Sequence, residues 1–267
     1  MRLGAVIRTM GPASNPGTVR TCARAVEEAG LDELWVVDHI AIAPDDAEGS
    51  GGRYLDPLTA LAWIAGMTER VGIGTAILNL PYRPPLPTAK AIASVQELSG
   101  GRLQLGVGVG WMEAEFRALG VDRSRRGRLT DEMLDFLERC FATDELIVND
   151  QPMLFLPRPK KPPIFVGGGS DAALARAVRA GDGWMPMGGN PAQLAPRIER
   201  LRELERDAGR TPLEIIVLGG VALDDPTRAR EQLAELSELG VTRLAQGIRY
   251  EEPNAFLEKI QVLAALR

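Results

Sequence analysis

The sequence predicts an α/β protein, a (β/α)₈ or TIM barrel in which residues 1–267 form a single domain. Short β-rich runs alternate with longer runs of helical periodicity, eight times and in strict order. The length of 267 residues is typical of one uninterrupted barrel. An open doubly wound sheet is the rival, but such a sheet usually has a glycine-rich turn after its first strand. The segment Arg8-Thr9-Met10-Gly11-Pro12 is not such a turn, which favours the closed barrel.

The first four βα units are predicted from apolar runs and the signals at their ends. Their strands have nearly continuous apolar stretches, as parallel strands buried on both faces do, and are expected at 3–8, 33–38, 71–78 and 103–109. The helices show apolar residues at helical spacing, with Asp56-Pro57 as a start signal and Gly100-Gly101 as an end signal. They are expected over about 19–30, 56–69, 87–99 and 128–142.

The last four units begin after an interruption. Residues 143–162 break the alternation, and a polar turn at 149–151 between apolar triplets predicts a small hairpin inserted before the fifth strand. The remaining strands are expected at 164–166, 183–187, 214–218 and 241–245. The helices that follow them each carry one apolar face, and are expected from Ser170 onward and over 194–204, 229–239 and 256–263.

Composition excludes several classes of partner. The net charge of −5 and the pI near 5.2 argue against nucleic acid and against an anionic membrane surface, because both reward a basic face. No segment approaches the roughly 20 apolar residues of a membrane helix. Cys22 and Cys140 lie on apolar helical faces and are expected to be reduced core residues. We therefore expect a cytoplasmic protein that acts on a small molecule.

In a TIM barrel the active site lies at the carboxyl ends of the strands. Those ends are poor in reactive groups here. The four lysines fall on helices or the insertion, which excludes a Schiff base, and a single histidine excludes a multi-histidine metal site. Asp38 is the only acid at an early strand end, so a glycosidase-like carboxylate pair is hard to assemble. A bound cofactor is the expected carrier of the reaction, and a barrel without activity is the alternative.

Glycines and one histidine mark the candidate site. Gly167, Gly168, Gly169 and Ser170 stand where a strand ends and a helix begins, so their amides could hold a phosphate. Glycine at 106, 108 and 110 could let a flat ring approach the backbone, although glycines also end strands for structural reasons. His39 could hydrogen-bond a substrate oxygen or relay its proton. The alternative for Asp38-His39 is a helix-capping aspartate and a polar loop histidine.

At these residues the sequence resembles the luciferase-like monooxygenase superfamily, specifically its branch of probable F420-dependent oxidoreductases. The resemblance covers nearly the whole chain. The segments that carry it are AGLDELWVVDH (29–39), YLDPLTAL (54–61), TERVGIGT (68–75), LPYR (80–83), LSGGRL (98–103), GVGVGW (106–111) and GDGWMP (181–186).

The resemblance implies a barrel that holds FMN or the deazaflavin F420 across the strand ends, with phosphate bound at Gly167–Ser170. It implies a strained, possibly cis, peptide within Thr75-Ala76-Ile77 behind the ring, and it places His39 beside the reactive ring carbon. Further cofactor contacts are expected from Asp38, Gly108, Gly110 and Trp111. Substrate contacts are expected from Met10, Trp184 and Met187. A homodimer is implied as well.

The chain departs from the family pattern at Trp111, where well-known F420 dehydrogenases of the family carry a glutamate; Glu113 is the candidate substitute. Arg8 and Arg83 could meet an acidic cofactor tail, but we expect both to be surface arginines. The leading hypothesis is hydride transfer between F420 and a small organic substrate, with His39 as acid–base or orienting group. An FMNH₂-dependent monooxygenase is the alternative, and a cofactor-binding protein without turnover is the third.

Overall fold

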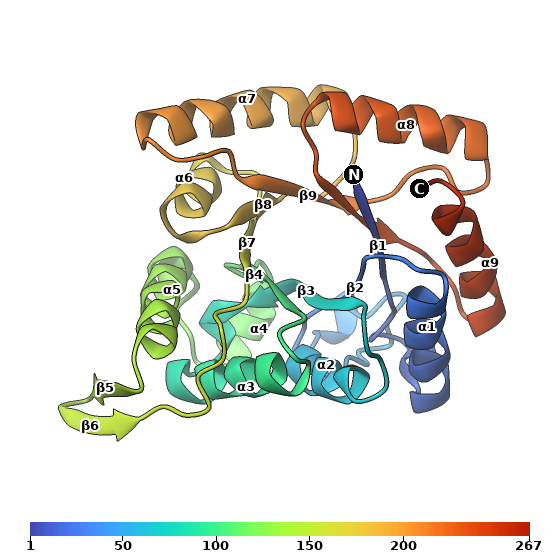
Figure 1. The fold of residues 1–267 in the computed structure, drawn as a ribbon. Coiled ribbons are helices and arrows are strands. Elements are labelled where there is room, and N and C mark those ends of the chain that lie inside the picture. Colours follow the sequence, from blue (N-terminus) through green and yellow to red (C-terminus); the bar gives the residue numbers. More distant parts are fainter.

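Eight parallel strands close into a barrel in the computed structural model, which describes all 267 residues (Figure 1). The strand order around the barrel is β1-β10-β9-β8-β7-β4-β3-β2, and the pairing of β1 with both β2 and β10 closes it. The barrel strands are β1 (Arg2–Val6), β2 (Glu33–Val36), β3 (Gly72–Asn79), β4 (Leu103–Gly108), β7 (Ile164–Gly167), β8 (Gly183–Met185), β9 (Glu214–Gly219) and β10 (Arg243–Gly247). The predicted (β/α)₈ fold is confirmed.

Helices cover the outside of the barrel, and most begin at a residue that satisfies free backbone amides. The side chains of Asn15, Asp56, Ser170, Asn190 and Asp225 each cap a first turn. The surrounding helices are α1 (Pro16–Glu28), α2 (Pro57–Ala65), α3 (Pro85–Leu98), α5 (Arg126–Ala142), α6 (Asp171–Ala180), α7 (Pro191–Asp207), α8 (Pro226–Glu238) and α9 (Pro253–Ala264). Short 3₁₀ turns occur at Pro12–Ser14, Pro44–Asp46, Leu80–Tyr82 and Arg123–Arg125.

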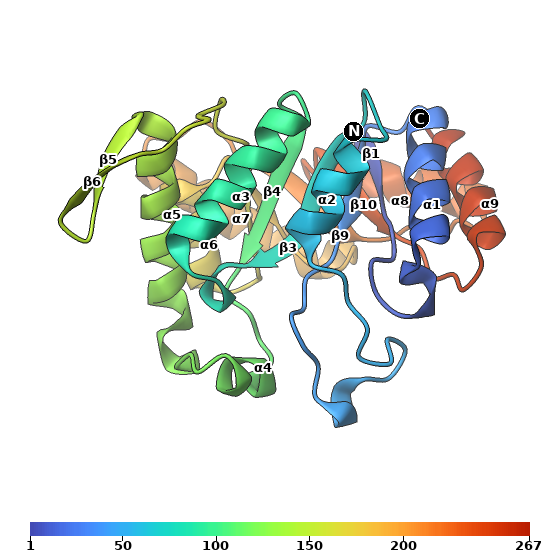
Figure 2. The ribbon, with the colours of Figure 1, turned by 90° about the horizontal axis from the view of Figure 1, so that it is seen from below.

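Two segments extend beyond the simple barrel. The predicted insertion is a hairpin of β5 (Glu145–Val148) and β6 (Gln151–Leu154), and it projects away from the barrel (Figures 1 and 2). A short helix that the sequence did not predict, α4 (Glu113–Ala118), lies between β4 and α5. Figure 2 shows that α4 and the long loop after β2 extend beyond the barrel on the same side. That side carries the strand ends where a TIM barrel keeps its site.

The interior of the barrel is filled with side chains. Trp35 and Phe165, from strands that are not neighbours, meet edge to face at 6.4 Å across it. Val6, Ile77 and Leu218 pack on this inner layer and are only partly buried, so they form the floor of the barrel mouth. The opposite end is closed by a buried ion pair of Arg243 and Glu33, 2.5 Å apart. Val6, Ile77 and Leu218 therefore mark the end of the barrel interior at which a ligand can contact partly exposed side chains.

Two expectations about the whole chain can be compared with the structure. Cys22 and Cys140 are free and buried, as expected of reduced core residues, and burial raises the pKa of each thiol to about 11. None of the helices combines the length and the apolar character that crossing a membrane requires.

Candidate active site

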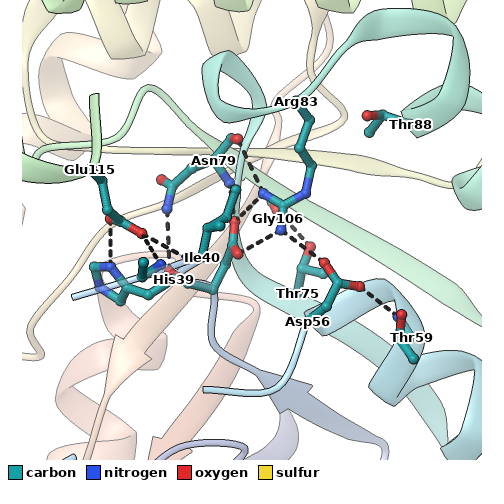
Figure 3. Close-up of polar contacts among 12 residues, drawn as sticks. His39, Ile40, Asp56, Thr59, Thr75, Asn79, Arg83, Thr88, Gly106 and Glu115 are labelled. Carbon is teal, nitrogen blue, oxygen red and sulfur yellow. Dashed lines mark hydrogen bonds and ion pairs between the residues drawn. The ribbon is translucent and has the colours of Figure 1, made fainter. Parts of the chain in front are cut away.

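His39 lies just beyond β2 on the floor side and is held by a carboxylate from α4. Its Nδ1 is 2.8 Å from Oε2 of Glu115, and 14% of its side chain is exposed. Figure 3 shows the two side chains meeting from different elements. No protein group hydrogen-bonds the other ring nitrogen, Nε2. His39 thus has one nitrogen fixed by the protein and one available to a ligand.

Glu115 is buried, with 1% of its side chain exposed. Its Oε1 accepts hydrogen bonds from the amides of Ile40 at 2.7 Å and Ala41 at 3.2 Å. Burial alone would raise the pKa of Glu115, but the hydrogen bonds from His39 and these amides outweigh it and hold the pKa below its ordinary value. An ionised carboxylate can only accept, so Nδ1 of His39 carries the hydrogen. Glu115 therefore fixes the tautomer in which a neutral His39 presents Nε2 as an acceptor.

Aromatic rings surround His39. Tyr54 lies 4.9 Å from the imidazole at an interplanar angle of 63°, and Trp111 lies 5.9 Å away at 89°. Trp111 is 62% exposed, and its exposed neighbour Ile40 adds to an apolar rim at the strand ends. Such a rim suits a flat organic group and strengthens hydrogen bonds by excluding water.

Asp38, expected to contact the cofactor, is instead fully engaged within the protein. Both of its oxygens accept from Arg83 at 2.8 Å, and Oδ2 also accepts from the amide of Asn79. Arg83 also donates from Nη2 to Oδ2 of Asp56, the residue that caps α2 (Figure 3). The expectation that Arg83 is a surface residue is wrong, because only 9% of its side chain is exposed. The Asp38–Arg83 pair fixes the backbone that carries His39.

The segment Thr75-Ala76-Ile77, for which the resemblance implied a strained, possibly cis, peptide, lies in β3, and Ala76 and Ile77 belong to the inner layer of the barrel. The peptide bond between Ala76 and Ile77 is cis, which confirms that expectation. The Thr75 hydroxyl is buried and donates to the carbonyl of Gly106 at 2.6 Å (Figure 3). Ile77 presents its side chain to the floor. Of the three residues, Ile77 is therefore the one placed to contact a bound ring.

The glycines of β4 do not expose the backbone as expected. A Cβ at Gly106 would lie 2.0 Å from the carbonyl oxygen of Thr75, and one at Gly108 would lie 2.0 Å from Cδ1 of Ile77. A Cβ at Gly110, which lies two residues beyond the end of β4, would be 2.9 Å from the side chain of Tyr82. The expectation of an open approach for a flat ring is therefore wrong. These glycines let β3, Ile77 and Tyr82 pack closely against β4.

The loop after β7 does present free amides. Gly168, Gly169 and Ser170 are exposed, and none of their amides donates to a protein acceptor. Gly168 has φ = +108°, a conformation that favours glycine. Trp184 is fully buried and donates from Nε1 to the carbonyl of Gly168 at 2.7 Å. Trp184 thus supports this loop, whereas we had expected it to contact the substrate.

A cavity of about 1260 Å³ opens at the ends of β1 and β10. Met10 is one of its lining residues and also pairs through its backbone with Tyr54, whose ring contacts His39. Met187 is 83% exposed at the end of β8. The predicted substrate residues therefore lie apart: Met10 lines the cavity, Met187 lies on the rim, and Trp184 is internal.

Two side chains of the site, Glu115 and Tyr54, were not singled out from the sequence, and a third, Arg83, was named but expected at the surface. Glu115 has no local signal, because it stands in a short helix next to the more exposed Glu113. Tyr54 and Arg83 lie within segments that matched the family, YLDPLTAL and LPYR, so the resemblance offered a signal for both. Glu113 itself is 68% exposed and does not contact His39, so it does not replace the family glutamate there. Glu115 is the glutamate that contacts His39.

Comparison with known proteins gives consistent results. A family model described as luciferase-like monooxygenase matches residues 1–265. An uncharacterized protein of Mycobacterium tuberculosis is 34% identical over 248 residues, which cover 85% of this chain and 83% of that protein. The F420-dependent glucose-6-phosphate dehydrogenase of Kineococcus radiotolerans is 30% identical over 244 residues, 85% of this chain and 70% of that protein. The FMN complex of the oxygenating constituent of 3,6-diketocamphane monooxygenase from Pseudomonas putida superposes with a TM-score of 0.77, at 16% identity over 99% of this chain and 96% of that one.

Proposed function

Because the chain belongs to the luciferase-like monooxygenase family, we propose that it is an F420-dependent oxidoreductase that transfers hydride between the deazaflavin and a small organic substrate. Similar proteins use F420 or FMN, which supports a flavin-type cofactor in this barrel. The relative at 30% identity is F420-dependent, and this relationship favours the deazaflavin.

The observation that carries the proposal is the His39–Glu115 pair. With Nδ1 bound at 2.8 Å to a buried carboxylate, Nε2 is the atom left to accept or donate a proton at the substrate oxygen. Reduction of a carbonyl needs a proton on oxygen for each hydride delivered to carbon, and oxidation of an alcohol releases one. A histidine with a fixed tautomer at the mouth of the barrel meets this need.

The residues at the mouth fit a cofactor with a flat ring and a phosphate. The free amides of Gly168, Gly169 and Ser170, at the N-terminus of α6, would hold a phosphate. Ile77 on the floor and Trp111 on the rim would contact the ring. When bound, a reduced deazaflavin supplies the hydride; the protein orients the substrate, limits water and moves the proton.

The experiment is to titrate the purified protein separately with F420 and FMN, oxidised and reduced, following fluorescence or heat. We expect F420 to bind at least about tenfold more tightly than FMN, a difference of about 1.4 kcal/mol. Tight binding of FMN alone, with oxygen consumption on reduction, would overturn the proposal in favour of a monooxygenase. Oxygen consumption distinguishes hydride transfer from oxygenation because reduced F420 reacts poorly with oxygen. Binding without turnover of carbonyl or alcohol substrates would instead indicate a non-catalytic binding protein.

Glu115→Gln is expected to lower turnover by up to about 10⁴-fold, the loss found when the carboxylate that orients a catalytic histidine is replaced by its amide. The amide of the new glutamine can donate to Nδ1 and so favour the tautomer with the hydrogen on Nε2. The pH dependence of the rate should therefore change more than the affinity for substrate. The measurement is the pH profile of kcat/KM. Glu113→Gln, on the same helix but exposed, is the matched control and should keep normal activity. Equal losses in both variants would contradict a specific role for Glu115.

A further inference from the structure

The large cavity has charged side chains in its lining and lies across the barrel from the free amides of the β7 loop. Its floor includes Val6 and Gly247, and its walls come from residues 48–53 and 248–252. In the strand order β7 is four positions from β1 in either direction, so the two places face each other across the mouth. A ligand anchored at the β7 loop therefore leaves this cavity for a separate chemical group.

Two guanidinium groups in the cavity are held in place without a neutralising carboxylate. Arg8 donates to the carbonyls of Tyr250 at 2.8 Å and Gly49 at 3.0 Å. Arg53 donates from Nε to the Ser14 hydroxyl at 2.8 Å and from Nη2 to the Ser14 carbonyl at 3.3 Å. Neither side chain forms an ion pair within 4 Å. Both guanidinium groups are therefore held in a fixed orientation with no carboxylate paired to them.

The remaining charged residues of the wall are not fixed in this way. Arg249 and the acids Glu48, Glu251 and Glu252 are exposed and form no hydrogen bond or ion pair. Free glutamate side chains can turn toward water when an anion enters, at little cost, because their interaction is screened by solvent. The anchored arginines cannot turn away. The charges that hydrogen bonds hold in place in this cavity are those of Arg8 and Arg53, and both are positive.

We propose that this cavity is an anion subsite, in which Arg53, Arg8 and Arg249 bind a phosphate or carboxylate group. Guanidinium suits such groups because its planar N–H donors match two oxygens at once. The anion belongs either to the substrate or to the acidic tail of the cofactor, an assignment that rests on the proposed function. The subsite itself rests only on the geometry of the cavity.

The first experiment uses inorganic phosphate as the probe and requires no cofactor. Calorimetric titration of the protein should detect binding that Arg53→Ala and Arg249→Ala each weaken by about tenfold, the loss of a charge-assisted hydrogen bond. Arg206→Ala, an exposed arginine near the end of α7, is the matched control and should bind as the unaltered protein does. Arg249 is exposed and forms no hydrogen bond or ion pair, so its removal should not affect folding. Unchanged phosphate affinity in Arg249→Ala and Arg53→Ala would overturn the proposal.

The second experiment identifies the source of the anion. F420 is titrated with and without saturating phosphate. If phosphate competes and Arg53→Ala weakens F420 binding, the subsite takes the cofactor tail. If Arg53→Ala leaves F420 affinity unchanged, the subsite takes the substrate even where phosphate competes with F420 at the β7 loop, and a screen should begin with phosphorylated and carboxylated alcohols or ketones. Absence of F420 binding would count against the proposed function while the phosphate titration still decides the subsite.

Discussion

Turnover by the His39→Ala variant is expected to be about 10²- to 10⁴-fold lower than that of the unaltered protein, the usual contribution of a positioned general acid–base group. Alanine removes Nε2, the ring nitrogen that no protein group engages. The neighbouring pair of Asp38 and Arg83 does not depend on the imidazole, so the strand end should keep its shape. Cofactor affinity should change by no more than a few fold. The measurements are steady-state kinetics and the cofactor titration described above.

His39→Gln separates proton transfer from simple orientation. Glutamine retains a hydrogen-bond donor and acceptor but has no proton to exchange near neutral pH. If His39 transfers the proton, the glutamine variant should be about as slow as the alanine variant and should lose the dependence of rate on pH. Recovery of most of the activity in His39→Gln would show that His39 only orients the substrate. Normal turnover in His39→Ala would remove it from the reaction.

The barrel could be predicted because its signals are local. Each buried strand is a short apolar run and each helix has one apolar face, so strict alternation determined the topology. Even the interruption at 143–162 was visible, and it forms the predicted hairpin. The helix Glu113–Ala118 was missed because it has six residues and no side-chain cap. Isolated helices of that length have little intrinsic stability, so only its packing on the barrel produces it.

The site was predicted less completely because its central contacts join distant residues. His39 could be singled out as the lone histidine at a strand end, but Glu115 is 76 residues away and has no spacing that relates it to His39. Arg83 was expected at the surface because nothing nearby in sequence showed that Asp38 would meet it. The glycines of β4 show the reverse case, in which the residues were identified but their role was not. Their pattern was visible, but which neighbour fills each space depends on packing between strands.

Arg83→Met is expected to destabilise the protein by about 3–5 kcal/mol, the cost of leaving one member of a buried ion pair alone. The Asp38 side chain is 0% exposed and would keep only the amide of Asn79 as a partner. Methionine has similar volume, so the loss reflects charge and hydrogen bonds more than packing. Urea denaturation measures the effect. The double variant Asp38→Asn/Arg83→Met should recover part of it, because no unpaired charge then remains buried.

The pH dependence of the stability lost in Arg83→Met shows whether the loss comes from an unpaired charge or only from lost packing contacts. Burial raises the pKa of Asp38 above its ordinary value, and the hydrogen bonds and charge of Arg83 offset only part of this shift. Without Arg83 the folded-state pKa rises further above the unfolded value of about 3.9. The folded state then binds a proton that the unfolded state releases, so stability falls as pH increases through this interval. The deficit of Arg83→Met should be largest near pH 7 and shrink toward pH 4, whereas a deficit independent of pH would show that the arginine acts through packing alone.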